Sequence, residues 1–454
     1  MTDEDIGPAS VDHAEDRAGP AVRRLADWND DWLAGLVDQY GSPLYVIDLD
    51  RVRQNCERLL TAFPNADVRY AAKAHTGRAV LETVRSVGHS RDDDRRIEED
   101  DGADRRIDIE CASAGEVRRA IDAGFSGDRI HYTAVNPPGI DLDTVVDRWE
   151  KYPELTITAG ATDTIDRLED RGYDGRLCLR VNPGVGAGHH EKVETGAAAK
   201  FGVPIERALE VGKDAADRFE FVGIHAHAGS GISGEDLSEH RELVRRMGTL
   251  ARALADEGVS IEFVDVGGGF GVPYREEEPP LDLTAVAEAT RSALGEVSTP
   301  DGEPVELAIE PGRYVVADAG VLLTRINTIK TARDATVVGA DAGMTTLLRP
   351  AMYDAYHPVR NVSRDGPATT VTIAGPICES ADVLANDRKI AAPERGDVLA
   401  VGIAGAYGYE MASTYNSRPR PPEVAHDTGT VGRVRRGEQI ADLTRLEVEL
   451  TTTD

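Results

Sequence analysis

Short apolar runs alternate with stretches of helical periodicity between residues 68 and 312. Each run is followed by Gly, Pro, Asn or Ser, and stretches such as 114–123, 163–171 and 234–257 carry apolar residues at helical spacing. The runs are 68–73, 107–113, 130–135, 155–160, 177–183, 221–229, 263–269 and 306–312. Strand–helix repeats of this kind form either a (β/α)8 barrel or an open doubly wound α/β sheet. Eight of them within about 245 residues favour the closed, TIM-like barrel.

The pattern changes after Arg313, where strand-like runs follow one another without a long helical stretch. Residues 369–373, 397–401 and 446–451 are the clearest of these runs. Before the barrel, residues 28–40 predict a short helix and residues 44–47 a strand. We therefore predict a flexible acidic N-terminus (1–27), a barrel (46–315), and a second, mostly β domain of sandwich-like or barrel-like form made by 28–45 and 316–454.

Residues 90–106 interrupt the barrel pattern between its first two repeats. This stretch contains eight acids and five arginines and almost no apolar residue. Such a composition is typical of a solvated surface insertion.

The net charge of −30 narrows the classes of partner. It argues against nucleic acid, because phosphates would be repelled. No apolar run approaches a membrane span, and the first residues lack a basic-then-apolar signal. The four cysteines form no CxxC pair, which favours a reducing, cytoplasmic setting.

The acids are spread along the whole chain instead of forming one tail. Salt screens the self-repulsion that such a charge produces, and halophilic proteins have this balance. The excess of 44 arginines over 7 lysines and the low aromatic content agree with a halophilic source.

Lys73 is unusual because it ends a strand of small, apolar and aromatic residues. A desolvated lysine can lose its proton and become a nucleophile, although a strand-end lysine can also extend its amine into water. In a (β/α)8 barrel the active site lies where strands end. Chemically active groups follow the ends of several runs. They are Lys73, Arg180, Asn182, His225, His227, Ser230, Gly267–Gly269, Glu310, Gly312 and Arg313.

Each of these groups has a structural alternative when it is taken alone. Gly267, Gly268 and Gly269 allow backbone N–H groups to approach a phosphate, but such a triplet also forms flexible turns. His225 and His227 face the same side of a strand, yet no third metal ligand is evident, and stacking of one histidine on a planar ring is the better interpretation. Glu310 at a buried strand end needs a partner, either a protonated ring nitrogen or Arg313.

Taken together, these groups at the strand ends indicate one kind of site. A lysine amine, a phosphate cradle, a stacking histidine and a carboxylate opposite a ring nitrogen together predict a pyridoxal 5'-phosphate site.

The chain also resembles the barrel-type, alanine-racemase-like pyridoxal phosphate decarboxylases, and within them the diaminopimelate branch. The resemblance runs from about residue 40 to residue 424, with the acidic insertion as an interruption. The matching stretches are Tyr70–Ala74, Arg180–Gly184, Thr195-Gly196, Lys200–Gly202, His225–Ser230, Gly267–Gly269, Glu310–Arg313, Asp341–Met344, Arg349–Tyr353, Gly375–Ser380, Gly405–Gly408, Tyr415-Asn416 and Arg418–Pro421.

This resemblance implies roles on the cofactor side. Lys73 would hold the cofactor covalently, and Glu310 would keep its ring nitrogen protonated so that the ring accepts electrons. His227 would stack on the ring. The phosphate would be held by Ser230, the Gly267–Gly269 turn and Gly312, and Tyr407 would also contact the cofactor.

On the substrate side, the resemblance implies decarboxylation of meso-2,6-diaminopimelate to L-lysine. Arg313, Arg349, Tyr353 and Tyr407 would bind the substrate, and the arginines suit the carboxylate that is retained. Glu379 would bind the distal ammonium. Cys378 would protonate the carbanion from the partner subunit of a homodimer with shared sites, although a free cysteine is more often a small buried hydrophobe.

Four residues depart from the family pattern. They are His75, where asparagine is usual, Ala228 and Gly231 beside the Gly-Ser pair, and Ile403, where aspartate is common. Because they lie beside matched residues, they would alter cofactor affinity or rate and not the class of reaction.

Other functions remain as alternatives. Ornithine- or arginine-type decarboxylases share the fold, but their substrates lack a second carboxylate for Arg313 and Arg349. A non-catalytic pyridoxal phosphate carrier would be a lone barrel, and a racemase would need a tyrosine as a second base, which is not evident.

Overall fold

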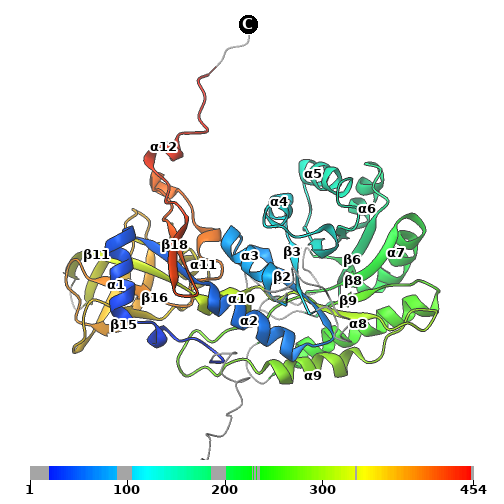
Figure 1. The fold of residues 1–454 in the computed structure, drawn as a ribbon, viewed down its shortest axis with the longest axis horizontal. Helices are drawn as coiled ribbons and strands as arrows, with labels where there is room; N and C mark the ends of the chain where they lie inside the picture. The colour runs from blue at the N-terminus through cyan, green and yellow to red at the C-terminus, as the bar shows by residue number, and fades with distance from the viewer. Residues whose placement is uncertain are drawn as a thin grey trace, which may run out of the picture.

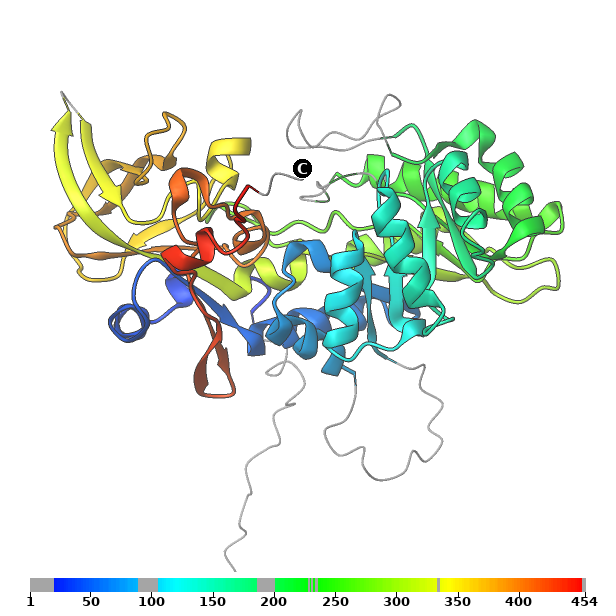
Figure 2. The ribbon, with the colours of Figure 1, turned by 90° about the horizontal axis from the view of Figure 1, so that it is seen from above.

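The computed structural model describes residues 20–88, 105–185, 201–227, 229, 232, 236–332 and 335–450. Ser230, Ala228 and Gly231, most of the predicted N-terminal segment and residues 90–104 of the acidic insertion lie outside these ranges. The described chain forms two lobes side by side, a barrel and a mostly β lobe, as Figures 1 and 2 show.

The first lobe is a closed barrel of eight parallel strands, which confirms the predicted fold class. Its pairing runs β5-β4-β3-β2-β10-β9-β8-β6, and an additional pairing of β5 with β6 closes the ring. Each strand falls within or beside one of the eight predicted runs. The strands are β2 (Ala66–Ala71), β3 (Ile107–Cys111), β4 (Ile130–Tyr132), β5 (Thr156–Ala159), β6 (Arg176–Asn182), β8 (Glu220–His225), β9 (Phe263–Asp265) and β10 (Glu306–Ile309).

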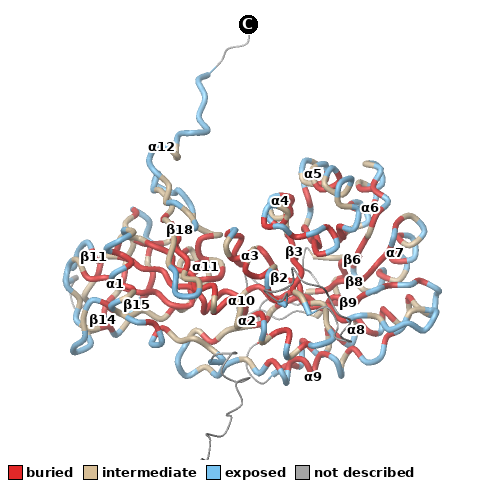
Figure 3. Tube along the Cα trace, in the orientation of Figure 1, coloured by how far each residue is buried: buried red, intermediate tan, exposed pale blue. Residues whose placement is uncertain are grey.

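Helices cover the outside of the barrel, and buried side chains concentrate in the strands and on the inner helix faces (Figure 3). α2 precedes β2 in the chain and closes the ring by contacts with α3 and α9. The helices are α2 (Leu49–Ala62), α3 (Arg78–Ser86), α4 (Ala114–Asp122), α5 (Gly139–Trp149), α6 (Thr162–Glu169), α7 (Ile205–Arg218), α8 (Ser238–Asp256) and α9 (Leu283–Leu294). A two-residue strand, β7 (Val203–Pro204), pairs in parallel with Val181 and Asn182 at the end of β6.

The second lobe is built on a nine-stranded mixed sheet. Seven strands follow the order β15-β14-β12-β11-β1-β17-β18, while β16 pairs with both β11 and β13. The strands are β1 (Leu44–Asp48), β11 (Gly320–Ala332), β12 (Ala335–Ala340), β13 (Val359–Asn361), β14 (Ala368–Ala374), β15 (Val383–Ala391), β16 (Val398–Val401), β17 (Glu423–Asp427) and β18 (Thr430–Arg435). β1 belongs to this sheet along its full length, because it pairs antiparallel with β11 and parallel with β17.

Residues 20–27 pack against the β lobe instead of trailing from it. Leu25, in the short 3-10 helix η1 (Leu25–Asp27), is buried with Trp28, and Arg23 forms an ion pair with Asp48. α1 (Asp30–Tyr40) follows, with the Asn29 side chain accepting the N–H of Trp32. The described end of the predicted flexible segment is therefore part of a hydrophobic core.

The expectation of a strand at residues 446–451 is wrong for its described part. α12 (Ile440–Leu443) leads into an extended tail in which Leu446 and Leu450 are 84% and 94% exposed. The alternating sequence is strand-like, but a strand needs a partner for its backbone hydrogen bonds, and this tail leaves the sheet behind (Figure 1).

Candidate active site

Lys73 lies just beyond the carboxyl end of β2. The strand ends at Ala71, and the 3-10 turn η2 (Ala72–Ala74) carries Lys73 onto the rim. Its Nζ donates a hydrogen bond to Oε2 of Glu110 at 2.7 Å, and its side chain is 39% exposed, while that of Glu110 is 2% exposed. An accessible amine is thus anchored by a buried carboxylate on the neighbouring strand β3.

The proton on Lys73 is held more tightly than the sequence suggested. Burial by itself lowers the pKa of Lys73, but the carboxylates of Glu110 and Glu310 raise it by more, so the net shift is upward. The lysine is therefore protonated in the chain alone. Burial also raises the pKa of Glu110 and of Glu310, which makes either carboxylate a feasible acceptor when the amine reacts.

Glu310 follows β10 and is fixed by a histidine. Nε2 of His225 lies 3.1 Å from its Oε2, and burial lowers the pKa of His225 to about 3. The imidazole is accordingly neutral and donates its Nε2–H to the carboxylate. This hydrogen bond fixes the orientation of Glu310 in a buried place.

The Gly267–Gly269 turn follows β9 and has a backbone conformation that favours glycine. Gly267 and Gly269 have φ values of +74° and +101°. The N–H of Gly267 donates to Oδ1 of Asp265 at 2.8 Å. A Cβ at Gly268 would lie 2.2 Å from the carbonyl oxygen of Glu310, so a side chain there would disrupt the contact between the two strand ends.

His227 and His225, which the sequence offered as a possible pair of metal ligands, contact different partners. Nδ1 of His227 accepts the N–H of Gly268 at 3.0 Å, whereas His225 contacts Glu310. Burial, followed by the charge of Lys73, lowers the pKa of His227 well below its ordinary value. An uncharged ring fixed at this rim suits stacking on a flat aromatic cofactor.

These residues fit pyridoxal phosphate. The fit rests on an accessible lysine amine, a buried carboxylate held by His225, a neutral imidazole and a glycine turn that leaves no room for side chains. Gly312 belongs to the same rim, since a Cβ there would lie 3.0 Å from Cβ of Ala71.

Arg313 and Arg349 meet around one tyrosine where the two lobes join. Nη1 of Arg313 donates to the hydroxyl of Tyr274 at 2.7 Å, and the guanidinium of Arg349 lies 4.9 Å from the centre of the same ring. Burial by itself raises the pKa of Tyr274, but the two arginines outweigh it and lower that pKa. Arg349 is buried and Arg313 is half-buried, and two cations held around one ring form an anion site.

The rest of the cluster holds Arg349 in place and connects it to the rim. α11 (Arg349–Tyr353) carries Arg349 and Tyr353, and Nη1 of Arg349 donates to Nε2 of His357 at 2.8 Å. Arg313 stacks on Tyr407, 4.8 Å from its ring centre, and the backbone N–H of Tyr407 donates to the carbonyl of Ala74. Through Tyr407 the arginine cluster adjoins the turn that bears Lys73.

Cys378 and Glu379 lie elsewhere, on the loop between β14 and β15. Both are exposed, and Sγ of Cys378 accepts a hydrogen bond from Nδ2 of Asn416 at 3.3 Å. Within the residues that the structure describes, we find no contact from either side chain to the Lys73 rim. One chain by itself therefore does not bring these two residues to the other predicted site residues.

His75, where the family usually has asparagine, connects the turn that carries Lys73 to the second lobe. Its Nε2 lies 2.7 Å from Oε1 of Glu423 on β17, and its Nδ1 accepts the N–H of Gly77. Arg435 on β18 approaches the other oxygen of Glu423 at 3.4 Å. His75 thus fixes the turn after Lys73 against the β lobe.

Replacement of Glu423 with glutamine is expected to destabilise the protein most near neutral pH. Burial raises the pKa of Glu423, but His75 and Arg435 outweigh it and lower that pKa below its ordinary value. The ionised carboxylate therefore stabilises the fold above the unfolded pKa of about 4.3, and this stabilisation is lost as pH falls through the folded pKa.

We expect Glu423→Gln to cost about 3 kcal/mol at pH 7, because removing one partner leaves buried charge unpaired. The measurement is urea unfolding at pH 7 and at pH 4, and the difference from the wild type should shrink at pH 4. Glu82→Gln, which breaks only an exposed pair with Arg78, is the control. A difference that grows toward acid pH would contradict this account.

Several important residues had no clear signal in the sequence. Glu110 lies inside the predicted run 107–113, next to the last residue of β3, so a search of all eight runs for carboxylates near their ends would have found it. Asp265 precedes the glycine turn and could have been recognised as its cap. Tyr274 and His357 lie in irregular segments, and only the fold shows that they contact Arg313 and Arg349.

Comparison with known proteins places this geometry in a family. The profile described as "Pyridoxal-dependent decarboxylase, pyridoxal binding domain" matches residues 49–317. The diaminopimelate decarboxylase of Methanothermobacter thermautotrophicus is 42% identical, over 90% of this chain and 92% of its own. That of Escherichia coli K12 is 34% identical, over 92% and 96%.

Solved structures agree with the sequence relatives. The diaminopimelate decarboxylase from M. jannaschii in complex with L-lysine has a TM-score of 0.80 and 29% identity, covering 92% of this chain and 94% of that one. The Helicobacter pylori enzyme complexed with L-lysine has a TM-score of 0.79 and 29% identity, over 91% and 98%.

Proposed function

This chain belongs to the diaminopimelate decarboxylase family, and on that premise we propose how its residues convert meso-2,6-diaminopimelate to L-lysine and CO2. The chain is a carboxy-lyase that uses pyridoxal 5'-phosphate. When bound, the cofactor acts as an electron sink for the negative charge that CO2 leaves behind. The protein must bind it, orient the substrate and manage the protons.

On the cofactor side, Lys73 would supply the amine that anchors the cofactor, and the substrate amine would take its place. Glu110, 2.7 Å away, accepts and returns protons at Nζ. Glu310, fixed by His225, would keep a proton on the ring nitrogen, and the imidazole of His227 would stack on the ring. Gly267–Gly269, Gly312 and Ser230 would hold the phosphate, and Tyr407 would contact the cofactor.

On the substrate side, the observation that carries the proposal is the pair Arg313 and Arg349. They surround Tyr274 beside the Lys73 turn, and we assign them, with Tyr353 and Tyr407, to the carboxylate that the product retains. Ornithine and arginine have no such second carboxylate, so they would leave both cations without an anion. This favours diaminopimelate over the alternative substrates.

The test is release of CO2 by the purified holoenzyme from meso-diaminopimelate, ornithine and arginine in parallel. We expect turnover of diaminopimelate to exceed that of the other two by at least about 100-fold, because a buried charge left unpaired costs several kcal/mol. Equal or faster turnover of ornithine would overturn the assignment of Arg313 and Arg349.

The exposed position of Cys378 and Glu379 supports a homodimer in which each site is completed by the partner subunit. Cys378 would then donate a proton to the carbanion, and Glu379 would bind the distal ammonium of a substrate held in the other chain. The second lobe carries both residues on one loop, so a single contact between subunits would deliver them together.

Coexpression of Lys73→Ala and Cys378→Ala chains tests the shared site. If the two residues act across subunits, a mixed dimer keeps one intact site, and activity recovers to about a quarter of that of the wild type. Each variant alone should be inactive or nearly so. No recovery on coexpression would show that Cys378 acts within its own chain or not at all.

The charge and the cysteines support a cytoplasmic, salt-rich setting. Cys56, Cys111, Cys178 and Cys378 are all unpaired thiols. In the described residues no helix has the length and apolar character needed to cross a membrane. With a net charge of −30, self-repulsion should be severe in dilute buffer.

We therefore expect the midpoint of thermal unfolding to rise by several degrees between 0.1 M and 2 M KCl, because salt screens like charges. Calorimetry at the two salt concentrations would measure the difference. A midpoint that is unchanged or lower in 2 M KCl would count against a halophilic source.

A further inference from the structure

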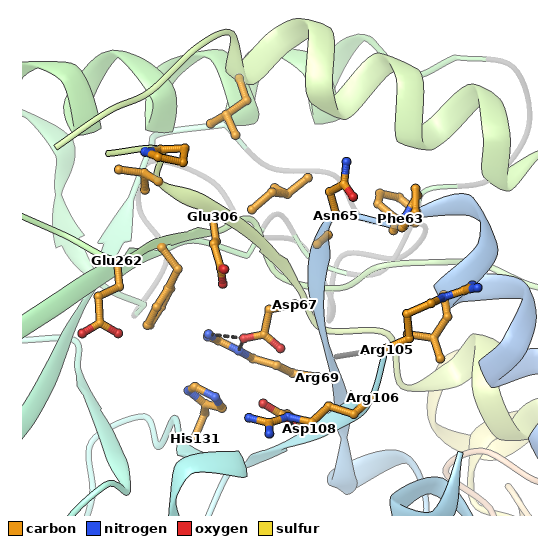
Figure 4. Close-up of a pocket in the computed structure, with 18 of the residues that line it drawn as sticks. Phe63, Asn65, Asp67, Arg69, Arg105, Arg106, Asp108, His131, Glu262 and Glu306 are labelled. Carbon is orange, nitrogen blue, oxygen red and sulfur yellow. Dashed lines mark hydrogen bonds and ion pairs between the residues drawn. The ribbon is translucent and has the colours of Figure 1, made fainter. Parts of the chain in front are cut away.

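The end of the barrel opposite Lys73 contains a cavity of about 840 Å³. Its lining comes from the first residues of several barrel strands and includes many charged side chains (Figure 4). None of these residues has a role in the reaction described above. The cavity therefore needs a separate explanation.

Three of the lining residues could act together as ligands. Asp67 is on β2, Asp108 on β3 and His131 on β4, which are consecutive neighbours in the barrel. One ligand atom from each lies within 4.8 Å of the others. Figure 4 shows the three side chains gathered around Arg69 on one wall of the cavity.

His131 is the residue that points to a ligand. It is only 5% exposed, yet neither of its ring nitrogens has a hydrogen-bond partner. Its ring packs edge-on against Phe263. Burial, followed by the charge of Arg69, lowers its pKa well below the ordinary value, so the imidazole is neutral with a free lone pair. A buried polar ring left without partners is unfavourable, and neutral imidazole is the form that binds metal.

Arginines already contact the carboxylates of Asp67 and Asp108, but they do not occupy every hydrogen-bond acceptor position of these groups. Arg69 lies 2.6 Å from Asp67, while Arg106 and Arg129 lie 3.2 and 3.0 Å from Asp108. An ionised carboxylate offers about four acceptor positions. The arginines would thus compete with a metal ion and weaken its binding, and they have no lone pair to offer it.

We propose that Asp67, Asp108 and His131 bind a divalent transition-metal ion of the zinc type, which links the first three strands of the barrel. One imidazole and two carboxylates are common ligands for such ions. Bonds of about 2.1 Å place ligand atoms roughly 3.5 Å apart, so small side-chain rotations complete the site. The site is independent of the decarboxylation, because it lies at the opposite end of the strands.

The test uses Co²⁺, whose visible absorption reports its ligands, added to holoenzyme that has been treated with EDTA. We expect one equivalent per chain, and His131→Gln should lose at least tenfold in affinity. His426→Gln is the matched control, because His426 belongs to another group, with Asp48 and Asp50, whose atoms also lie within 4.8 Å. Loss of Co²⁺ binding in His426→Gln, or no change in His131→Gln, would overturn the proposal.

Arg106→Gln gives a prediction of the opposite sign. Arg106 is 31% exposed and pairs with Asp108 and Asp128, so its removal takes away a competing cation. We expect Co²⁺ to bind several-fold more tightly, and weaker binding would contradict the assignment of Asp108.

If His131→Gln does not fold, Asp67→Asn replaces it, and X-ray absorption of the zinc-loaded wild type identifies the ligands. One imidazole with two carboxylates supports the site, and any other ligand set, or no stoichiometric zinc, overturns it.

Discussion

Replacement of Lys73 with alanine is expected to lower decarboxylation of meso-diaminopimelate by more than about 10³-fold, because in our proposal its amine anchors the cofactor and exchanges with the substrate amine. The visible absorbance of the lysine-linked cofactor should disappear in the same variant. Lys73→Arg should be equally inactive, since an arginine keeps the positive charge beside Glu110 but cannot act as an amine nucleophile.

Lys213→Ala is the control for this prediction. Lys213 pairs with Glu257 on the outer surface and is 46% exposed, so its loss removes a lysine without touching the rim. It should retain full activity. Absorbance of the linked cofactor that persists in Lys73→Ala would refute the role given to Lys73.

Replacement of Glu310 with glutamine is the second large effect that we expect. In our proposal the buried carboxylate keeps the ring nitrogen protonated, and a neutral amide could not hold that proton, so kcat should fall by about 10²- to 10³-fold with a smaller change in KM. The absorption spectrum of the bound cofactor should also change, because the ring loses its proton.

Glu306 offers a control on the same strand. It starts β10 at the opposite end of the barrel and is exposed, so Glu306→Gln changes the same chemical group without reaching the site. It should leave kcat unchanged. A Glu310→Gln enzyme with kcat within threefold of the wild type would show that the ring nitrogen needs no carboxylate here.

The barrel could be predicted because its signal is local. Each strand is a short apolar run bounded by turn residues, and the closing of eight such units is a general property of the fold. The actual strands end a few residues before the predicted runs do. This places Lys73, Glu310 and the Gly267–Gly269 turn on loops at the rim instead of within strands.

The strand-like tail at 446–450 shows where local signals fail. Leu446 and Leu450 alternate with polar residues as an amphipathic strand would, yet they are exposed. A strand forms only where a partner edge is available, and that depends on how the preceding chain is placed.

The protonation state of Lys73 could not be predicted from the sequence either. Its position at the end of an apolar strand suggested desolvation and a lowered pKa. The fold brings the carboxylates of Glu110 and Glu310, distant in sequence, against the amine, and their charge outweighs desolvation.

The sequence by itself determined the repeat pattern, the residues at the strand ends and the class of cofactor, since these follow from local periodicity and residue type. Only the tertiary structure decided which partner each group has. Glu110 joins Lys73, His225 joins Glu310, Tyr274 joins the two arginines, and His75 joins Glu423 on the second lobe. Charges, hydrogen bonds and the pKa values that they set depend on distances of a few ångströms between residues far apart in the chain, and such distances exist only in the folded protein.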